Sequence, residues 1–512
     1  MPTRHRIALP LVLVLMVTLL SVSSYAIPAF SRQYGTSCST CHVDFPKLND
    51  FGKAFKDAGF KFPKDDETFI KVPPVMLGAP AQKDLWPHTI FPGTIPGLPP
   101  IGLRYNTFFQ VAGNSRNNFN AQLPGDPTAP FIPRTDFQSG LFSIFMAGNF
   151  GSDIAFWVDD DISVGGGPDG GLGDGYLKFV NIGRFLKLPT DALSLRVGQF
   201  ELDLPFSPAR SWNLSGWDIY DQANVGVMNP AFKQQNVNNP FALSNAAQGV
   251  EFSGGHTYRG YHYSVAFVNQ NTSGNVSAGN NVPPVVGYTS DSNFKDIYAR
   301  FSYRFNLERD PASRNEIQAA GATGPRDHTY LNIGGLYFYG RSVQRFSDEA
   351  SGNVLTAREP FYRVGADFSL NYRTFNLFGQ YIYGHDHDLL QVPNTFVKGT
   401  PATFDGGFVE ADYLALPWLM TIMRWDGVNS RADRINGIGS TPDDSIGSFV
   451  SPFHSTRNRF TPGVQFLVHA NIKTSFEYQI RPQQVVYDPV TGNALTKPFR
   501  TNTAVAGLEF VY

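Results

Sequence analysis

A strict alternation of apolar and polar residues recurs from about residue 100 to the end of the chain. In the segment 297–305, Phe301 and Tyr303 are flanked by Arg300, Ser302 and Arg304. A period of two residues places alternate side chains on opposite faces of a β-strand. Because the same pattern returns at 362–372 and 472–480, we predict an all-β fold for this part of the chain.

The composition favours a membrane barrel over a water-soluble sandwich. Aromatic residues make up 14% of the chain and charged residues only 16%, whereas about a quarter of the residues of a soluble protein are charged. A soluble sandwich can show the same alternation, but it does not need so many outward-facing aromatics. Aromatics at the ends of alternating segments are typical of the girdles of a transmembrane β-barrel. After residue 26 no run of eighteen apolar residues occurs, which argues against helical membrane spans.

The last residues are the strongest single indication of class. Leu508 and Phe510 alternate with Gly507 and Glu509, and the chain ends on Tyr512. This pattern resembles the terminal strand of bacterial outer-membrane proteins, in which a C-terminal aromatic residue belongs to the insertion signal. The alternative is an edge strand of a soluble sheet.

The periodic segments and the turn residues between them predict about sixteen antiparallel strands, an even number as expected for a bacterial barrel. We place the strands near 103–111, 139–149, 153–161, 175–183, 193–200, 247–254, 260–270, 295–305, 329–340, 361–372, 374–384, 405–415, 417–426, 459–469, 472–481 and 501–512. The connections alternate between long, predicted to lie outside the cell, and short, predicted to be periplasmic. The long connection 306–328 breaks this rule, and it is either a long periplasmic turn or a missed hairpin.

The N-terminus predicts export. Basic residues at 4–6 precede an apolar run at 7–22 and small residues at 23–26, which is the pattern of a secretory signal peptide. We therefore predict a signal peptide over 1–26 and a mature protein that begins near Ile27. A transmembrane anchor is the alternative, although the run is short for a hydrocarbon core of about 30 Å.

The two cysteines of the chain lie in one motif, Cys38-Ser39-Thr40-Cys41-His42. This spacing allows two thiols to add to the vinyl groups of a haem while the adjacent imidazole ligates the iron. A thioredoxin-like pair would need a βαβ context, and a zinc site would need further Cys or His ligands nearby. We therefore predict one covalent haem c bound by Cys38, Cys41 and His42.

Residues 27–100 are predicted to form a small domain, mostly helical or irregular, around this haem, acting as a plug. A helix is expected over 46–58, with Pro46 in its first turn and Gly59 just past its end. Its apolar face could cover the haem, pack on the barrel wall, or both. The sixth iron ligand is either Met76, which follows a proline-rich approach, or His88.

The segment from Ile27 to Gly59, with the haem motif followed by Phe45-Pro46, Phe51-Gly52 and Phe55, resembles the fused outer-membrane cytochrome–porins of iron-oxidising bacteria. The close match covers about 35 residues, and the barrel matches as architecture. The segment 197–206 also resembles phosphate-selective porins. In the cytochrome–porin family a monohaem domain precedes a porin-like barrel, here 101–512, and electrons pass from extracellular Fe(II) inward.

We therefore predict an outer-membrane cytochrome that conducts electrons from extracellular Fe(II) to periplasmic carriers such as small c-type cytochromes, with Fe(II) oxidase activity implied by the resemblance. The alternatives are outward delivery of electrons to external acceptors, or a solute porin with a structural or gating haem plug. The other expected partner is outer-membrane lipid. The net charge of −2 gives no indication of nucleic-acid binding.

Two polar clusters are weaker candidates for binding metal. Residues 385–388 read His-Asp-His-Asp in a predicted outward-facing loop, and 159–175 is rich in Asp and Gly. Oxygen and imidazole groups can ligate iron or calcium, but both segments are expected to be solvated loops.

Overall fold

The structure is a computed structural model of the 512-residue chain. It describes residues 29–63, 66–87, 94–112, 135–151, 153–162, 171–211, 213–221, 243, 246–269, 293–307, 329–347, 354–386, 389–392, 395–398, 402–430, 458–480 and 502–512. The predicted signal peptide lies outside these residues.

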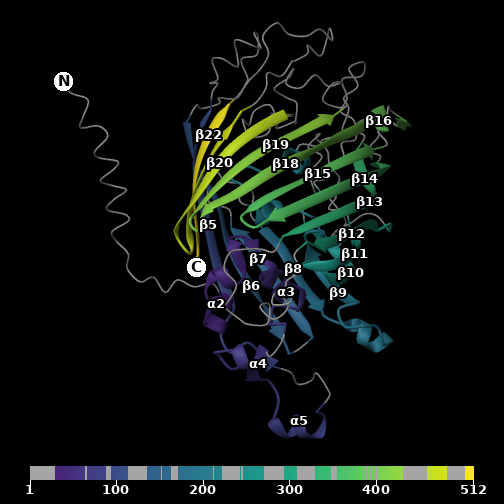
Figure 1. Cartoon of the computed structure of the whole chain (residues 1–512). Helices are drawn as coiled ribbons and strands as arrows, with labels where there is room; N and C mark the ends of the chain where they lie inside the picture. Colours follow the sequence, from purple (N-terminus) through teal and green to yellow (C-terminus); the bar gives the residue numbers. More distant parts are fainter. Residues whose placement is uncertain are drawn as a thin grey trace, which may run out of the picture.

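Sixteen strands form one closed antiparallel barrel (Figure 1). They are β5 (Ile101–Ala112), β6 (Thr135–Phe150), β7 (Ile154–Ile162), β8 (Gly171–Phe179), β9 (Ser194–Phe200), β10 (Ala247–His256), β11 (Arg259–Asn269), β12 (Asp296–Asn306), β13 (Tyr330–Ser347), β14 (Val354–Tyr372), β15 (Phe375–Asp386), β18 (Ala402–Leu416), β19 (Leu419–Ser430), β20 (Asn458–His469), β21 (Ile472–Gln479) and β22 (Thr503–Val511). The last strand, β22, pairs with the first, β5, and closes the ring. The predicted number and order of barrel strands are confirmed.

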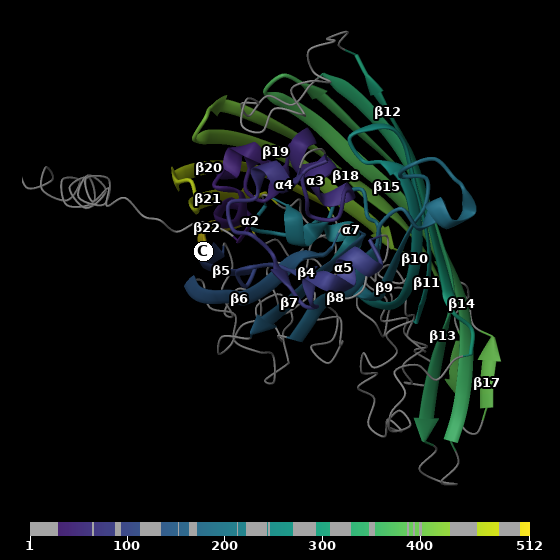
Figure 2. The same ribbon diagram turned by 90° about the horizontal axis from the view of Figure 1, so that it is seen from below.

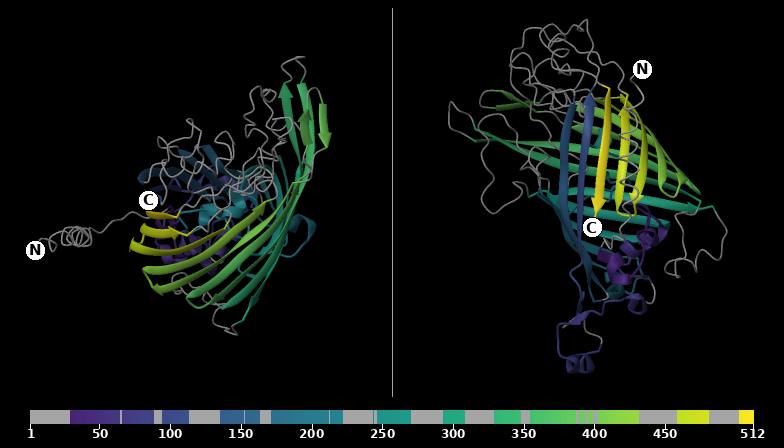
Figure 3. Two further views of the ribbon diagram at one scale, coloured as in Figure 1. Left: turned by 90° about the horizontal axis from the view of Figure 1, so that it is seen from above. Right: turned by 90° about the vertical axis from the view of Figure 1, so that its left-hand side faces the viewer.

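The connections also follow the predicted alternation. Short turns join β6 to β7, β10 to β11, β14 to β15, β18 to β19 and β20 to β21, all at one end of the barrel. The C-terminus lies at this same end (Figure 3). Because β12 pairs directly with β13, the barrel has no further strand between them. Residues 308–328, predicted as a long periplasmic turn or a missed hairpin, lie outside the described residues.

The two faces of the wall carry opposite chemistry. On β12 the Phe301 side chain is 56% exposed on the outer face, whereas Arg300 is 6% exposed on the inner face. The same division holds on β22, where Leu508 and Phe510 face outward and Glu509 is buried inside. A polar inner face and an apolar outer face are the arrangement of a transmembrane barrel.

The described residues between 29 and 100 form several short elements at the short-turn end. They are α2 (Ala29–Tyr34), η1 (Cys38–Thr40), β1 (His42–Asp44), β2 (Lys47–Leu48), α3 (Asp50–Asp57), α4 (Asp66–Phe69), β3 (Val75–Met76), α5 (Pro80–Leu85) and β4 (Thr94–Ile95). Viewed from below, α2 and α3 lie within the ring of strands (Figure 2). Among the described residues, no helix combines the length and apolar character needed to span a membrane.

The predicted helix over 46–58 is shorter than expected. It begins at Asp50, because Lys47 and Leu48 pair with β1 in a hairpin. Gly59 does follow its end, with a φ of +81° that favours a residue without a Cβ. Strands β13 and β14 are longer than predicted, because 341–347 also pair with 354–360. Backbone hydrogen bonds can extend a strand beyond the alternating segment that predicts it.

A segment after β9 folds back into the lumen, where a long external connection was predicted. This inserted segment consists of residues 201–211 and 213–221, and includes η3 (Pro208–Arg210) and α7 (Asp218–Asp221). Its Trp217 stacks on Phe408 of β18, with ring centroids 4.6 Å apart, and Tyr220 also packs in this cluster. Apolar residues at inward positions of the wall, such as Phe378, therefore bury a segment that would otherwise be exposed.

Polar contacts anchor the inserted segment at both sides of the lumen. Asp203 accepts hydrogen bonds from Ser264 of β11, at 2.8 Å, and contacts His262 at 3.0 Å. On the far side, Ser215 donates to Glu477 of β21 at 2.7 Å, and Arg424 of β19 donates to the Ser215 carbonyl at 2.8 Å. The segment therefore crosses the barrel interior from one wall to the other.

Candidate functional site

The two cysteines lie at the two ends of one tight turn. Cys38 opens the 3-10 turn η1, and the backbone N–H of Cys41 donates to the Cys38 carbonyl at 3.1 Å. Both thiols are free and half-buried. The turn leads directly into β1, which begins at His42. The structure therefore brings Cys38, Cys41 and His42 together in one compact unit.

Asn49 fixes this turn to helix α3. Its side-chain Nδ2 donates to the carbonyls of Ser39 and Thr40 at 3.1 and 3.0 Å. Its Oδ1 accepts from the Gly52 N–H at 2.9 Å and so caps the helix. Gly52 permits the close approach, since a Cβ there would lie 2.1 Å from the Cys41 carbonyl oxygen. Sequence reasoning did not single out Asn49, although Asn directly before a helical pattern is a recognisable capping signal.

The protonation states suit a haem-binding unit better than a thiol–disulfide pair. Burial raises the pKa of both cysteines, that of Cys41 to about 12, so Cys38 lacks the lowered pKa that the nucleophilic first cysteine of a thioredoxin-like pair needs. Burial lowers the pKa of His42 to about 4, although the carbonyls of Pro46 and Lys47 oppose this shift. The imidazole is therefore neutral at pH 7, as a metal ligand must be.

The residues of the motif fit a haem c. The His42 Nδ1 is buried without a hydrogen-bond partner in the part of the chain that the structure describes, and a neutral imidazole beside two free thiols is the donor set of covalent haem attachment. Within the same described residues, no group of three or more His, Cys, Asp or Glu side chains is arranged to hold a metal ion.

The hairpin β1–β2 carries the motif into the mouth of the barrel. Val43 packs against Leu414, Met420 and Ile422 of β18 and β19. Lys47 donates to Asn376 of β15 at 2.8 Å. Farther around the same side of the barrel, Lys473 of β21 donates to the Phe45 carbonyl at 3.2 Å.

A buried ion pair makes the main polar contact between α3 and the barrel. The two terminal guanidinium nitrogens of Arg304, on β12, donate to the Asp50 carboxylate, at 2.8 and 2.7 Å. The side chains of Arg304 and Asp50 are only 2% and 9% exposed. Farther along α3, Asp57 accepts from the N–H and the hydroxyl of Thr257, each at 2.9 Å. The N-terminal segment is thus held by specific contacts with several strands.

The apolar face of α3 packs both on its own segment and on the barrel wall. Phe51 and Phe55 lie in an aromatic cluster whose other members include Tyr34, Phe60, Phe62, Ala147 of β6 and Ala155 of β7. Phe60 also contacts Trp157 of β7, with ring centroids 5.7 Å apart. Cys41 packs against this cluster, so the wall-packing alternative for the helix is confirmed.

Of the two candidate sixth ligands, the structure describes Met76. Met76 lies in β3, which pairs with β4, and its side chain is 40% exposed. His88 lies outside the described residues. Both residues remain predictions.

The two polar clusters are placed differently from the expectation. His385 lies within β15 and stacks on Tyr362 of β14 at 5.1 Å, while 387–388 are outside the described residues. The ladder between β15 and β18 continues through His385. Asp159, Asp160 and Asp161 lie within β7, in agreement with the strand predicted near 153–161, so the expectation of a loop fails only for this start of the stretch 159–175. Residues 163–170 lie outside the described residues.

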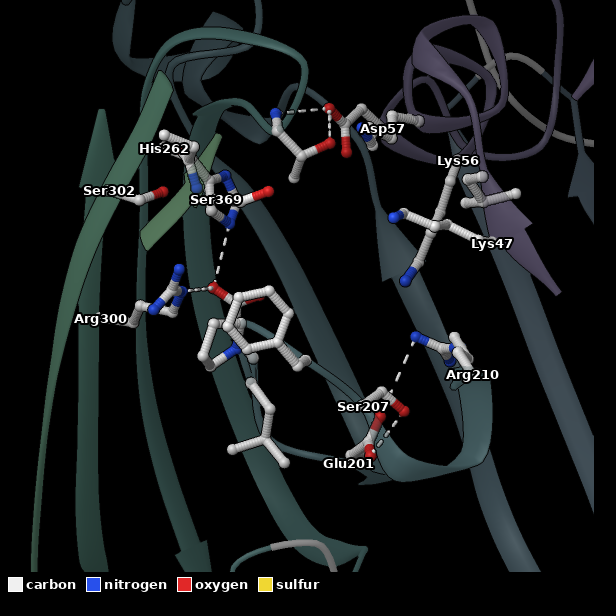
Figure 4. Close-up of a pocket in the computed structure, with 18 of the residues that line it drawn as sticks. Lys47, Lys56, Asp57, Glu201, Ser207, Arg210, His262, Arg300, Ser302 and Ser369 are labelled. Carbon is white, nitrogen blue, oxygen red and sulfur yellow. Dashed lines mark hydrogen bonds and ion pairs between the residues drawn. The ribbon is translucent and has the colours of Figure 1, made fainter. Parts of the chain in front are cut away.

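A cavity of about 340 Å³ lies in the lumen between the N-terminal segment and the inserted segment (Figure 4). Its lining is strongly charged. The basic residues are Lys47, Lys53, Lys56, Lys178, Arg196, Arg210, Arg300 and Arg304, and the acidic residues are Asp57, Glu201, Asp203, Glu251, Glu410 and Asp412. Sequence reasoning did not identify this site, because its residues come from segments far apart in the chain.

No protein-family model and no curated protein sequence matches this chain. Among solved structures, it is similar to a loop-deletion mutant of OmpT, an outer membrane protein of Vibrio cholerae, at 9% identity and a TM-score of 0.43, over 80% of this chain and 98% of that one. The outer membrane channel DcaP of Acinetobacter baumannii gives 9% identity and a TM-score of 0.43, over 80% and 96% of the two chains. OmpF of Salmonella typhi, solved with daunomycin, gives 10% identity and a TM-score of 0.44, over 80% and 97%.

Proposed function

We propose that the protein is an outer-membrane cytochrome that passes electrons between an extracellular donor and periplasmic carriers. The observation that carries the proposal is the docking of the Cys38–His42 unit into the short-turn mouth of a closed barrel. Cys38 and Cys41 would hold the haem through thioether bonds and His42 would ligate its iron. The haem would supply one-electron chemistry, and the protein would supply its position and environment.

The outer face of the barrel supports the membrane location. Large apolar and aromatic side chains, such as Phe301, Tyr381 and Phe476, are exposed there, and only lipid can cover such a surface favourably. With the short-turn end in the periplasm, the haem-binding unit faces periplasmic carriers. A donor outside the cell would approach through the opposite end.

The filled lumen supports electron transfer over solute passage. An outer membrane has a hydrocarbon core about 30 Å thick. A donor on one side and an acceptor on the other can both reach a single redox centre only if a protein barrel surrounds that centre within the membrane. The N-terminal segment fills the mouth, and the inserted segment crosses the interior behind it. Both segments restrict the passage of solutes without obstructing electrons.

Fe(II) is the donor that the family resemblance favours. The protein, expressed in a host that matures c-type cytochromes, is mixed with Fe(II) in a stopped-flow instrument while the haem absorption bands are followed. We expect reduction of the haem by Fe(II), followed by reoxidation with an oxidised small c-type cytochrome. A strongly negative midpoint potential, with no reduction by Fe(II), would instead support delivery of electrons outward. The variants M76A and H88A, compared by potential, assign the sixth ligand.

The second candidate is a solute porin with a haem plug, and the charged cavity in the lumen favours it. Planar-bilayer conductance separates the two functions. The electron-transfer proposal expects small or no channels from the haem-loaded protein. Large and stable open channels with the haem intact would establish the porin instead.

A further inference from the structure

The lumen cavity contains a group of basic side chains that converge from three parts of the chain. Lys56 projects from α3, Arg210 from the inserted segment, and Lys178 and Arg196 from β8 and β9. Figure 4 shows Lys56 and Arg210 directed into the same cavity. Such a group must be neutralised by carboxylates, or else it attracts an anion.

Two of these basic side chains already contact other protein groups. Arg196 forms an ion pair with Glu251, with 2.5 Å between Nη2 and Oε2. Lys178 lies 3.4 Å from the backbone carbonyl of Asp57. The Asp57 carboxylate itself accepts two hydrogen bonds from Thr257.

Lys56 and Arg210 are less well matched. Lys56 forms no ion pair within 4.0 Å with any residue in the described ranges. Arg210 forms two long ion pairs, with Asp174 at 3.7 Å and Glu201 at 4.0 Å, and neither carboxylate is within hydrogen-bond distance of the guanidinium. Glu201 also accepts a hydrogen bond from Ser207 at 2.8 Å.

The pKa of Lys56 also indicates that its positive charge is poorly compensated. Burial and the positive charges of Arg210, Arg196 and Lys178 lower the pKa of Lys56 to about 7, and the opposing effect of Asp57 is smaller. Glu201 of the inserted segment also attracts Lys56, but repulsion by the three cations outweighs the attraction by Asp57 and Glu201. An anion bound beside it would reverse that balance.

We propose that this cavity binds a small tetrahedral oxyanion, such as sulfate or phosphate, between the Lys56 ammonium and the Arg210 guanidinium. A guanidinium presents two parallel N–H donors that match two oxygens of such an anion, and an ammonium adds a compact charge. A cavity of about 340 Å³ holds an ion of this size with water around it. The site does not depend on a haem, so it stands or falls independently of the proposed function.

The position of the site gives the anion a structural consequence. Lys56 belongs to the N-terminal segment, whereas Arg210 belongs to the segment inserted behind it. An anion held by both side chains therefore links the plug to the interior of the barrel.

Equilibrium dialysis of the detergent-solubilised full chain with radiolabelled sulfate tests the site. Sulfate keeps the same charge between pH 6 and pH 8.5, so any pH dependence belongs to the protein. We expect one saturable site per chain that weakens about tenfold or more between these pH values, as Lys56 loses its proton. Unlabelled phosphate, but not chloride at equal ionic strength, should displace the label.

Variants locate the site. K56M and R210Q should each weaken sulfate binding by about tenfold, and K56R should retain it. The matched control is K53M, which removes another lysine of α3 that lines the same cavity but pairs with Asp50 at 3.5 Å. It should bind sulfate within about twofold of the parent chain. The proposal is overturned by the absence of saturable binding in the parent chain, or by unchanged binding in both K56M and R210Q.

Discussion

The barrel and the N-terminal segment are held together by different kinds of interaction. Each barrel strand bonds to two neighbours along a closed ladder, so stability is spread over many equivalent backbone contacts. Residues 29–63 instead depend on a few specific contacts, among them the Asn49 cap, one aromatic cluster and the buried Asp50–Arg304 pair. Single substitutions at these contacts should therefore leave the barrel intact. They should release the N-terminal segment from the barrel or remove its haem.

The largest expected effect is the loss of the haem. The double variant C38S/C41S removes both thiols, so we expect no covalent haem, seen as the absence of haem staining on a denaturing gel. The barrel should still fold, seen as the mobility shift between heated and unheated samples. The matched control S39A changes an exposed residue between the two cysteines and should keep the haem. Haem staining of the double variant would refute the assignment.

The next effect is undocking of the N-terminal segment. D50N leaves the Arg304 guanidinium buried with its charge uncompensated, and breaking one partner of a buried pair costs about 3–5 kcal/mol. We expect faster proteolytic cleavage within 29–63 while the barrel stays resistant. D153N is the control, because its pair with Arg184 is partly exposed and such pairs contribute at most about 1 kcal/mol. Equal cleavage rates in D50N and D153N would contradict the docking role.

The next effect is an opening of the lumen, which should change conductance while the N-terminal segment stays docked. Trp217 is 2% exposed and donates from Nε1 to Glu410 at 3.0 Å, so W217A creates a void and loosens the inserted segment, at a cost of about 3–5 kcal/mol. We expect increased single-channel conductance in planar bilayers. Trp425 is 47% exposed on the outer face of the barrel, and W425A should leave conductance unchanged. An unchanged W217A channel would show that the inserted segment does not restrict the pore.

The same contrast explains which features the sequence could predict. Barrel strands repeat one simple rule, so alternation at Phe301 and Arg300 was enough to place the wall and its two faces. The sequence pattern predicts an external connection for the inserted segment, because the burial of this segment depends on contact between Trp217 and Phe408, which are far apart in the chain. Phe378 and Ile382 at inward positions of β15 were the available signal.

The candidate site was predictable only in its local part. Cys38, Cys41 and His42 are contiguous, so their chemistry follows from spacing alone. Asn49 caps the N-terminus of α3. The sequence contains this capping signal, but the pattern predicts a helix that already begins at Pro46. The charged cavity required the full barrel, because Lys56 and Arg210 are brought together only by the tertiary structure.

The smallest expected effect is a pH-dependent gain in stability from K56M. The pKa of Lys56 falls to about 7 in the folded chain, whereas it is about 10.4 in an unfolded chain. The unfolded state therefore binds more protons between these values, so the folded state loses stability as the pH falls from about 10 to 7 and stays at that lower level below pH 7. Removing the charge should raise the melting temperature by a few degrees at pH 6 and have little effect at pH 10. In sulfate-free buffer, thermal unfolding in detergent at both pH values measures the difference, with K53M as the control. A melting temperature of K56M below that of the parent chain at pH 6 would mean that Lys56 makes a favourable interaction that outweighs the repulsion from Arg196, Arg210 and Lys178.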